Sequence, residues 1–98
     1  MDRERILGIL REHEAELKAA GVLHLRLFGS VARGDSTSAS DVDLLADFDQ
    51  AKPLTLQSLA KIEYQLDDLL GVKVDLSSAD SIYPRVRTRA LAEAVVAF

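Results

Sequence analysis

The chain has 98 residues, and its formal net charge of −4 argues against a nucleic-acid-binding surface and favours a partner with basic patches. It has no Cys and no apolar run near the roughly 18 residues of a membrane span, which excludes disulfides, thiolate metal sites and membrane-spanning helices. We expect a soluble, cytoplasmic protein that forms one domain over residues 1–98 and that can gain stability from a partner chain or by homo-oligomerisation.

The first predicted elements are a helix and a strand. Apolar residues at mostly three- and four-residue spacing among charged residues indicate an amphipathic helix over residues 2–20, and Gly21 is a suitable stop for it. Alternation over residues 22–28 predicts a strand. The side chains expected on one face of this strand are those of Leu23, Leu25 and Leu27.

The middle of the chain is predicted to form a loop, a buried strand and a long helix. Residues 29–40 are rich in Gly, Ser, Thr and Asp, which indicates a turn with a short helical segment around residues 31–33. A looser apolar alternation over residues 42–48 predicts a second strand. Leucines and isoleucine at helical spacing predict a helix over residues 54–70 that covers the sheet.

The last part of the chain adds a third strand and a final helix. Residues 72–76 alternate between apolar and charged, which predicts a strand, and residues 85–94 are predicted to form a helix. The apolar side chains expected to face inward from this helix are Val86, Ala90 and Leu91. Residues 95–98 fit either a short strand or an extension of the helix. The elements alternate as α-β-(short α)-β-α-β-α, which predicts an α/β (α+β) fold.

The turn after the first strand and the start of the second carry the chemistry. Gly29 has no Cβ, so a triphosphate can approach the backbone there, and the Ser30 hydroxyl can donate to phosphate oxygens. Asp41 and Asp43 are two residues apart on a predicted strand, so their side chains leave on one face. Two adjacent carboxylates repel each other, and Mg²⁺ commonly bridges such carboxylates to phosphates.

Asp75 is the candidate third acid of the site. It lies on another predicted strand, and its carboxylate can join Asp41 and Asp43 if the two strands are neighbours. Three carboxylates allow one or two divalent ions, one of which activates the attacking hydroxyl group. Asp75 considered alone is also compatible with an ordinary exposed strand residue.

This arrangement resembles the polymerase β-like nucleotidyltransferase superfamily, which has a Gly-Ser turn, a spacer and an Asp-x-Asp pair on the next strand. It is most similar to the minimal nucleotidyltransferases, and the resemblance covers nearly the whole chain. It rests on Gly29, Ser30, Ala32, Arg33, Gly34, Ser40, Asp41, Asp43 and Leu44, and on the segments 73–76 and 89–95. The resemblance implies the polymerase β-like fold, with a small mixed β-sheet and helices packed on it.

The resemblance also implies a function. Members of that family commonly act as antitoxins of a helical HEPN toxin by transferring AMP from ATP, with Mg²⁺, to a toxin tyrosine. The implied nucleotide-binding residues are Gly29, Ser30 and Arg33, and the implied catalytic and metal-binding residues are Asp41, Asp43 and Asp75. Arg33 either contacts phosphate or the acceptor, or pairs with an acid such as Asp35 to fix the loop. The alternatives are a non-catalytic antitoxin that masks the toxin and a transferase that modifies small molecules.

Overall fold

The computed structural model describes residues 2–34, 41–52, 54–79 and 84–98, and its elements follow the expected α/β order. They are α1 (Arg3–Glu12), α2 (Glu14–Ala19), β1 (Val22–Phe28), α3 (Gly29–Arg33), β2 (Val42–Phe48), α4 (Leu56–Leu70), β3 (Val74–Ser78), α5 (Pro84–Glu93) and β4 (Val95–Val96). The interpretations of Asp35 and Ser40 lie outside the described residues.

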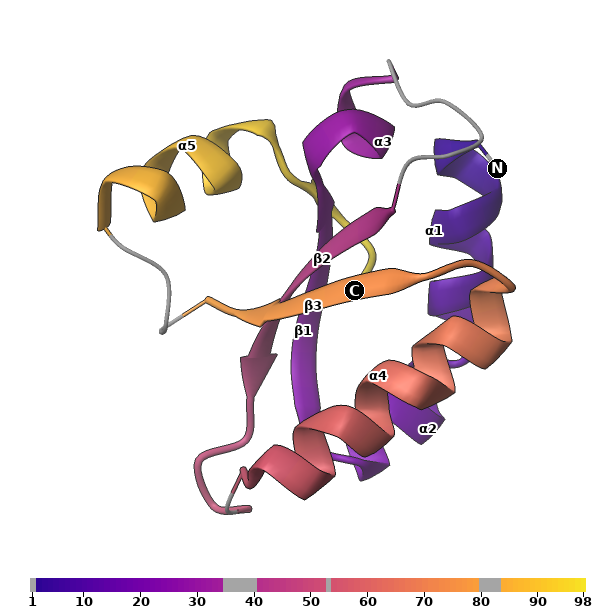
Figure 1. The fold of residues 1–98 in the computed structure, drawn as a ribbon, viewed down its shortest axis with the longest axis vertical. Helices are drawn as coiled ribbons and strands as arrows, with labels where there is room; N and C mark the ends of the chain where they lie inside the picture. Colours follow the sequence, from indigo (N-terminus) through magenta and orange to yellow (C-terminus); the bar gives the residue numbers. More distant parts are fainter. Residues whose placement is uncertain (1, 35–40, 53, 80–83) are drawn as a thin grey trace.

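The four strands form one mixed sheet in the order β3-β2-β1-β4 (Figure 1). β1 pairs antiparallel with both β2 and β4, whereas β2 and β3 are parallel. The expected small mixed sheet is therefore confirmed. Because β1 runs antiparallel to β2 and β3, its carboxyl end lies at the same end of the sheet as the amino ends of those two strands.

The helices cover the two faces of the sheet unequally. α1, α2 and α4 lie on one side of the sheet, and α5 lies on the other (Figure 1). The main core between the sheet and α1, α2 and α4 includes Ile6, Leu10, Leu17, Leu25, Leu27, Val42, Leu44, Ile62, Leu66 and Val74. A smaller cluster on the opposite face joins Leu45, Ala79 and Ala90, with Phe28 packed against it. Burial of this apolar surface stabilises the layers.

The ends of α4 are set by local hydrogen bonds. The Ser58 backbone N–H donates to the Thr55 hydroxyl at 3.0 Å, and the Ser58 hydroxyl accepts from the Thr55 N–H at 2.8 Å, so the two residues form a capping box. Gly71 ends the helix in the left-handed conformation, with a φ of 69°. The helix predicted over residues 54–70 is thus present and begins at Leu56.

The first predicted helix is broken in two. His13 separates α1 from α2, and its backbone N–H donates to the Ile9 and Leu10 carbonyl oxygens as α1 ends. The break falls between Leu10 and Leu17, where the apolar series of the sequence is interrupted. Both of these leucines are fully buried, so the break is compatible with burial on either side of it. No helix in the described ranges is both long and apolar enough to cross a membrane.

The expected orientation of Leu23 is wrong. Its side chain is 41% exposed, whereas Val22 and Leu25 are completely buried. The pairing of β1 with β2 shifts register between Val22 and His24, which marks an irregularity such as a β-bulge. An extra residue of this kind reverses the alternation of faces at that point, so Leu23 turns outward.

The third strand begins and ends two residues later than the predicted range 72–76. Ser77 and Ser78 extend β3 because they pair with Leu45 and Ala46 of β2. Backbone pairing with a neighbouring strand therefore overrides the polar character of the two serines.

The end of the chain also differs from the expectation. Val86 and Leu91 of α5 were expected to face inward, but they are 53% and 39% exposed, and Ala90 is the inward-facing residue. The helix touches the sheet through a narrow contact around Ala90, so its other apolar side chains stay outside the core. The open question over residues 95–98 is resolved in favour of a strand, β4, which pairs with β1.

Candidate active site

Three strand ends meet at one end of the sheet. Phe28, the last residue of β1, lies opposite Asp43 near the start of β2. Asp43 in turn lies opposite Asp75, near the start of β3. The topology therefore brings the Gly-Ser turn that follows Phe28 next to two acidic residues that are distant in the sequence.

Asp43 and Asp75 project from the same face of the sheet. They are partners in a parallel strand pair, and the residues on either side of each of them are buried in the main core. Side chains alternate along a strand, so both carboxylates point away from that core. Adjacent strands are about 4.8 Å apart, which allows two such carboxylates to approach one cation. The strand adjacency on which the hypothesis of a three-acid cluster depended is present.

Gly29 lies directly against Asp43. Its φ of 76° is in the left-handed region, where an L side chain is strained. A Cβ at this position would overlap Oδ2 of Asp43 and would lie 3.1 Å from its Cγ. Position 29 is therefore restricted to glycine both by conformation and by space. Ser30 follows in the first turn of α3 and is partly buried.

The carboxyl group of Asp43 is electrostatically crowded. Burial, followed by the charges of Asp75 and Asp41, raises its pKa above the ordinary value, and the Arg33 guanidinium opposes this rise. The charges of Asp75 and Asp41 therefore both act on the Asp43 carboxyl group. A divalent cation would relieve this repulsion and favour the ionised form.

The donors of this site suit Mg²⁺ when a nucleotide is also present. Asp41 lies exposed just before β2. In the part of the chain that the structure describes, no group of three or more His, Cys, Asp or Glu side chains is arranged to hold a metal ion by itself. Mg²⁺ usually takes one or two protein carboxylates and completes its coordination with water and phosphate oxygens. Asp43 and Asp75 fit such a site, with Asp41 beside them.

Arg33 forms an ion pair that joins α3 to α5. Its Nη1 lies 3.3 Å from Oε2 of Glu93. Of the two interpretations made from the sequence, this contact favours pairing with an acid, and Glu93 is such an acid within the described residues. A second contact joins α3 to α1, because Nη1 of Arg3 donates to the Ala32 carbonyl oxygen at 3.0 Å. Sequence reasoning missed Glu93, since no spacing pattern links two residues so far apart.

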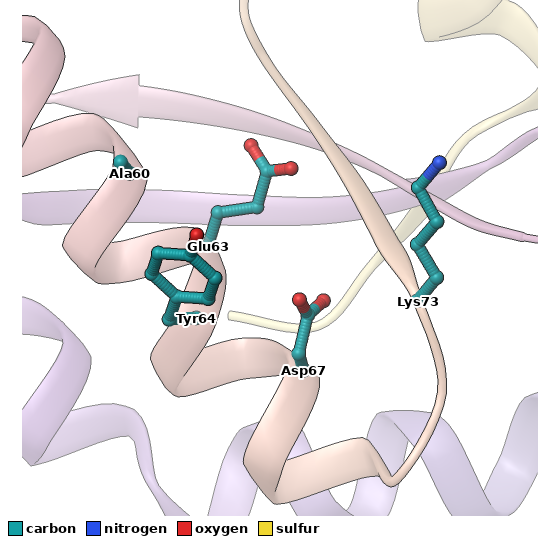
Figure 2. Close-up of a pocket in the computed structure, with 5 residues that line it drawn as sticks. All are labelled: Ala60, Glu63, Tyr64, Asp67 and Lys73. Atoms are coloured by element: carbon teal, nitrogen blue, oxygen red, sulfur yellow. The ribbon is translucent and has the colours of Figure 1, made fainter.

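A surface pocket of about 280 Å³ lies between α4 and the chain that leads into β3 (Figure 2). It is lined by Ala60, Glu63, Tyr64, Asp67 and Lys73. Burial, followed by the charges of Asp67 and Asp75, raises the pKa of the Glu63 carboxyl, and Lys73 opposes the rise. The charge of Asp75 thus acts on Glu63 as well as on Asp43. The sequence did not single out this pocket, since its residues form no recognisable motif.

A mixed sheet with a glycine turn against acidic strand ends is the arrangement of a nucleotidyltransferase. Residues 4–97 match the nucleotidyltransferase domain family, and the chain belongs to this family. It is therefore a nucleotidyltransferase enzyme, as the motif predicted.

The similar proteins extend over almost the full chain. The protein adenylyltransferase MntA of Thermococcus cleftensis is 37% identical over 93 residues, which cover 94% of this chain and 92% of the relative. A solved structure provisionally described as a minimal nucleotidyltransferase is 42% identical, with a TM-score of 0.80, and the match covers 97% of this chain and 95% of the other. The resemblance to minimal nucleotidyltransferases is thus confirmed.

A more distant structure shares only the fold. It comes from the complex of a tri-AMPylated HEPN toxin of Shewanella oneidensis with an MNT antitoxin. The match has a TM-score of 0.65 at 17% identity and covers 94% of this chain and 71% of the other. At this level of identity the similarity shows a common fold alone.

Proposed function

We propose that this nucleotidyltransferase transfers AMP from ATP, with Mg²⁺, to a tyrosine hydroxyl of a helical HEPN-type toxin and so acts as its antitoxin. Two similarities support the acceptor class: the relative in Thermococcus cleftensis is named a protein adenylyltransferase, and the Shewanella oneidensis complex contains an AMPylated HEPN toxin. The observation that carries the proposal is the pairing of Asp43 with Asp75 beside Gly29.

In the proposed reaction, the turn after β1 binds the triphosphate. The missing Cβ of Gly29 makes room for the Asp43 carboxylate beside the turn, and the amide groups of the turn and the Ser30 hydroxyl donate hydrogen bonds to the phosphate oxygens. Arg33 contributes positive charge at the edge of this turn. These contacts fix the α-phosphate in front of the acidic strand ends, and such positioning is a main source of rate in this type of chemistry.

The acids have separate roles in the proposal. Asp41 and Asp43 would hold Mg²⁺, which would neutralise phosphate charge and stabilise the leaving group. Asp75 would hold an activating ion or would take the proton of the acceptor hydroxyl itself. The acceptor oxygen then forms a bond to the α-phosphorus, the bond from that phosphorus to the α-β bridging oxygen breaks, and pyrophosphate leaves.

Mass spectrometry of a candidate toxin tests the proposal. The purified helical partner is incubated with this protein, Mg²⁺ and, in separate reactions, each of the four ribonucleoside triphosphates. We expect the partner to gain the mass of one or more AMP groups on tyrosine, with ATP as the preferred donor. A partner that gains no mass with any triphosphate, while a small-molecule hydroxyl such as that of an aminoglycoside does, would contradict the protein acceptor.

A second experiment separates catalysis from simple binding. The double substitution of Asp41→Ala and Asp43→Ala removes two proposed ligands, and we expect it to abolish neutralisation of the toxin at equal concentration. A matched control removes two exposed carboxylates of α1, by Glu4→Ala with Glu12→Ala, and should neutralise normally. If the Asp41 and Asp43 variant still neutralises the toxin, the protein acts by masking it.

A further inference from the structure

The outer edge of β3 carries backbone groups that point away from β2. The Val42 N–H donates to the Lys73 carbonyl oxygen at 3.0 Å, and the Ala79 N–H donates to the Ala46 carbonyl oxygen at 2.9 Å. In a parallel strand pair, every second residue bonds to a given neighbour, and Leu76 lies an odd number of residues from both bonded positions of its strand. Its N–H and carbonyl groups therefore point to the side of β3 where no described strand lies.

The opposite edge of the sheet is less suited to pairing. β4 has two residues, and the guanidinium of Arg11 donates to the carbonyl oxygens of Ala97 at 2.9 Å and Val96 at 3.0 Å. Backbone groups that are already bonded offer little to an added strand. β3, with five residues, is therefore the edge of the described sheet at which a further strand can add.

Asp67 connects the start of this edge to the pocket beside α4. Its Oδ1 accepts from the Val74 N–H at 2.8 Å, and the same residue lines the pocket of about 280 Å³. Figure 2 shows Glu63, Tyr64 and Asp67 on α4 and Lys73 on the chain that leads into β3. Tyr64 is 71% exposed, so most of its ring is accessible to a partner molecule. The pocket thus opens next to the point where β3 begins.

A strand added to β3 would place its side chains alternately on the two faces of the sheet. A side chain beside Asp75 would lie on the face that carries Asp43, and the next side chain would lie on the face that α4 covers. One extended segment can therefore bring a hydroxyl group to the proposed active site and the neighbouring side chain to the pocket.

The charge around this edge is mainly negative. Glu63, Asp67 and Asp75 are acidic, against the positive charge of Lys73, in a chain with a net charge of −4. If β3 of a second copy paired here, the same acids of two chains would face each other, and like charges destabilise a strand pair. A basic segment would instead be attracted. The charge therefore favours a basic partner over a second copy.

We propose that the β3 edge is a docking site for an extended, basic segment of the acceptor protein, which adds to β3 as a further strand and inserts a cationic side chain into the pocket beside α4. Main-chain hydrogen bonds to Leu76 and to the Val74 carbonyl oxygen would supply affinity, and the pocket would supply selectivity. The inference rests on the proposed function in one respect, because it assigns the acceptor hydroxyl to this segment. Docking itself requires no nucleotide.

Amide exchange measured by NMR with a peptide probe tests the docking. The probe is the end-blocked peptide Val-Arg-Tyr-Arg-Val, whose tyrosine and arginines point to opposite faces when it is extended. At about ten times its Kd, about one protein molecule in eleven is free, so exchange of the Leu76 N–H should slow about tenfold. The Val74 N–H, which is already bonded to Asp67, should change little.

Altered peptides separate strand pairing from charge attraction. N-methylation of the two arginines blocks one edge of the peptide, and N-methylation of the tyrosine and valines blocks the other edge. One of these peptides should lose affinity about tenfold or more while the other keeps it, because a strand pairs through one edge. Replacement of both arginines by glutamate should also weaken binding about tenfold or more.

A substitution in the pocket tests its part in docking. Ala60 is exposed on α4 and lines the pocket, so Ala60→Arg fills the space and adds a positive charge. We expect the affinity for the basic peptide to fall about five- to tenfold. The matched control is Ala15→Arg, which introduces the same side chain at an exposed position of α2 and should bind the peptide normally. Thermal unfolding checks that both variants fold.

Several outcomes would overturn the docking site. They are a basic peptide that does not bind, unchanged exchange of Leu76 at saturation, and equal binding of the two N-methylated peptides. Protection of Leu76 in the free protein that increases with protein concentration would also overturn it, because a second copy would then occupy the edge. Mass spectrometry reports AMP transfer separately. Transfer to the toxin without protection of Leu76 by the peptide would leave the proposed function intact, whereas protection without any transfer would contradict that function alone.

Discussion

Gly29 lies against the carboxylate of Asp43, at the point where β1 ends and β2 has just begun. A methyl group at position 29 would overlap Oδ2 of Asp43, and it would also have to occupy a left-handed backbone conformation with a φ of 76°. The turn that begins at Gly29 and the acidic strand are thus in direct contact. A change at the turn is therefore transmitted to the acid without any intermediate residue.

Gly29→Ala should accordingly damage both stability and activity. The strained φ costs roughly 1–2 kcal/mol in the free energy of unfolding, and displacement of Asp43 should lower AMP transfer about 100-fold or more. Gly71→Ala is the matched control, since Gly71 has a φ of 69° and a methyl group added there would meet no atom within 4 Å. This control should lose similar stability and keep its activity per folded molecule. Denaturant unfolding and transfer assays measure the two effects, and equal activity losses would contradict the contact with Asp43.

Asp43→Asn should stabilise the metal-free protein while it abolishes transfer. Because the folded-state pKa of Asp43 is raised, the ionised carboxylate destabilises the fold at neutral pH, and this cost disappears as pH falls below the pKa of the unfolded state. The melting temperature of the Asn variant should therefore exceed that of the wild type at pH 7, with a difference that shrinks in acid. Transfer activity should fall about 100-fold or more.

The control for this prediction is Asp68→Asn, which removes an exposed carboxylate from α4. Its melting temperature should stay close to that of the wild type at both pH values. Thermal unfolding in a chelator-containing buffer provides the measurement. A lower melting temperature for Asp43→Asn at neutral pH would show that the carboxylate stabilises the fold through contacts stronger than the repulsion from Asp75 and Asp41.

Mg²⁺ and ATP should stabilise the protein together far more than either does alone. The acids supply only part of a coordination shell, and phosphate oxygens are expected to complete it. A ligand present at about 100 times its Kd raises the free energy of unfolding by about 2.7 kcal/mol. Thermal shift measurements with Mg²⁺, ATP, both, and both plus a chelator check this expectation. Additive, independent shifts would mean that metal and nucleotide do not share a site.

The charge interaction of Lys73 with Glu63 should stabilise the folded protein. The lysine opposes the rise in the pKa of Glu63, so Lys73→Gln should lower stability at neutral pH, and less so in a Glu63→Gln background. Because both groups border an open pocket, we expect a coupling free energy below about 1 kcal/mol that decreases in high salt. Denaturant unfolding of the four proteins of this cycle gives the value, and a coupling of zero at low salt would refute the interaction.

Local patterns in the sequence predicted β1 and β2 to the residue, because each alternation is bounded by turn residues that stop the strand. They failed where pairing with another strand decides the outcome. The register shift after Val22 turns Leu23 outward, and the ladder with β2 carries β3 through Ser77 and Ser78. Neither event has a signature in the residues themselves.

The candidate site was predictable to a different degree for each of its parts. The approach of Gly29 to Asp43 follows from a turn between paired strands, so the motif suggested it. Asp75 depended on the strand order, which the sequence leaves open and the structure supplies. The pairing of Arg33 with Glu93 depends on where α5 packs, and among the described side chains of α5 it is the small Ala90 that joins the cluster on the sheet.

The position of β3 at the edge of the sheet bears on the size of what can reach the site. Among the described strands, β3 has β2 as its one neighbour, and Asp75 is exposed. A loop of a large partner molecule can therefore approach Asp75 from the open edge of the sheet. An open edge of this kind is consistent with the proposed acceptor, a folded protein that presents a tyrosine.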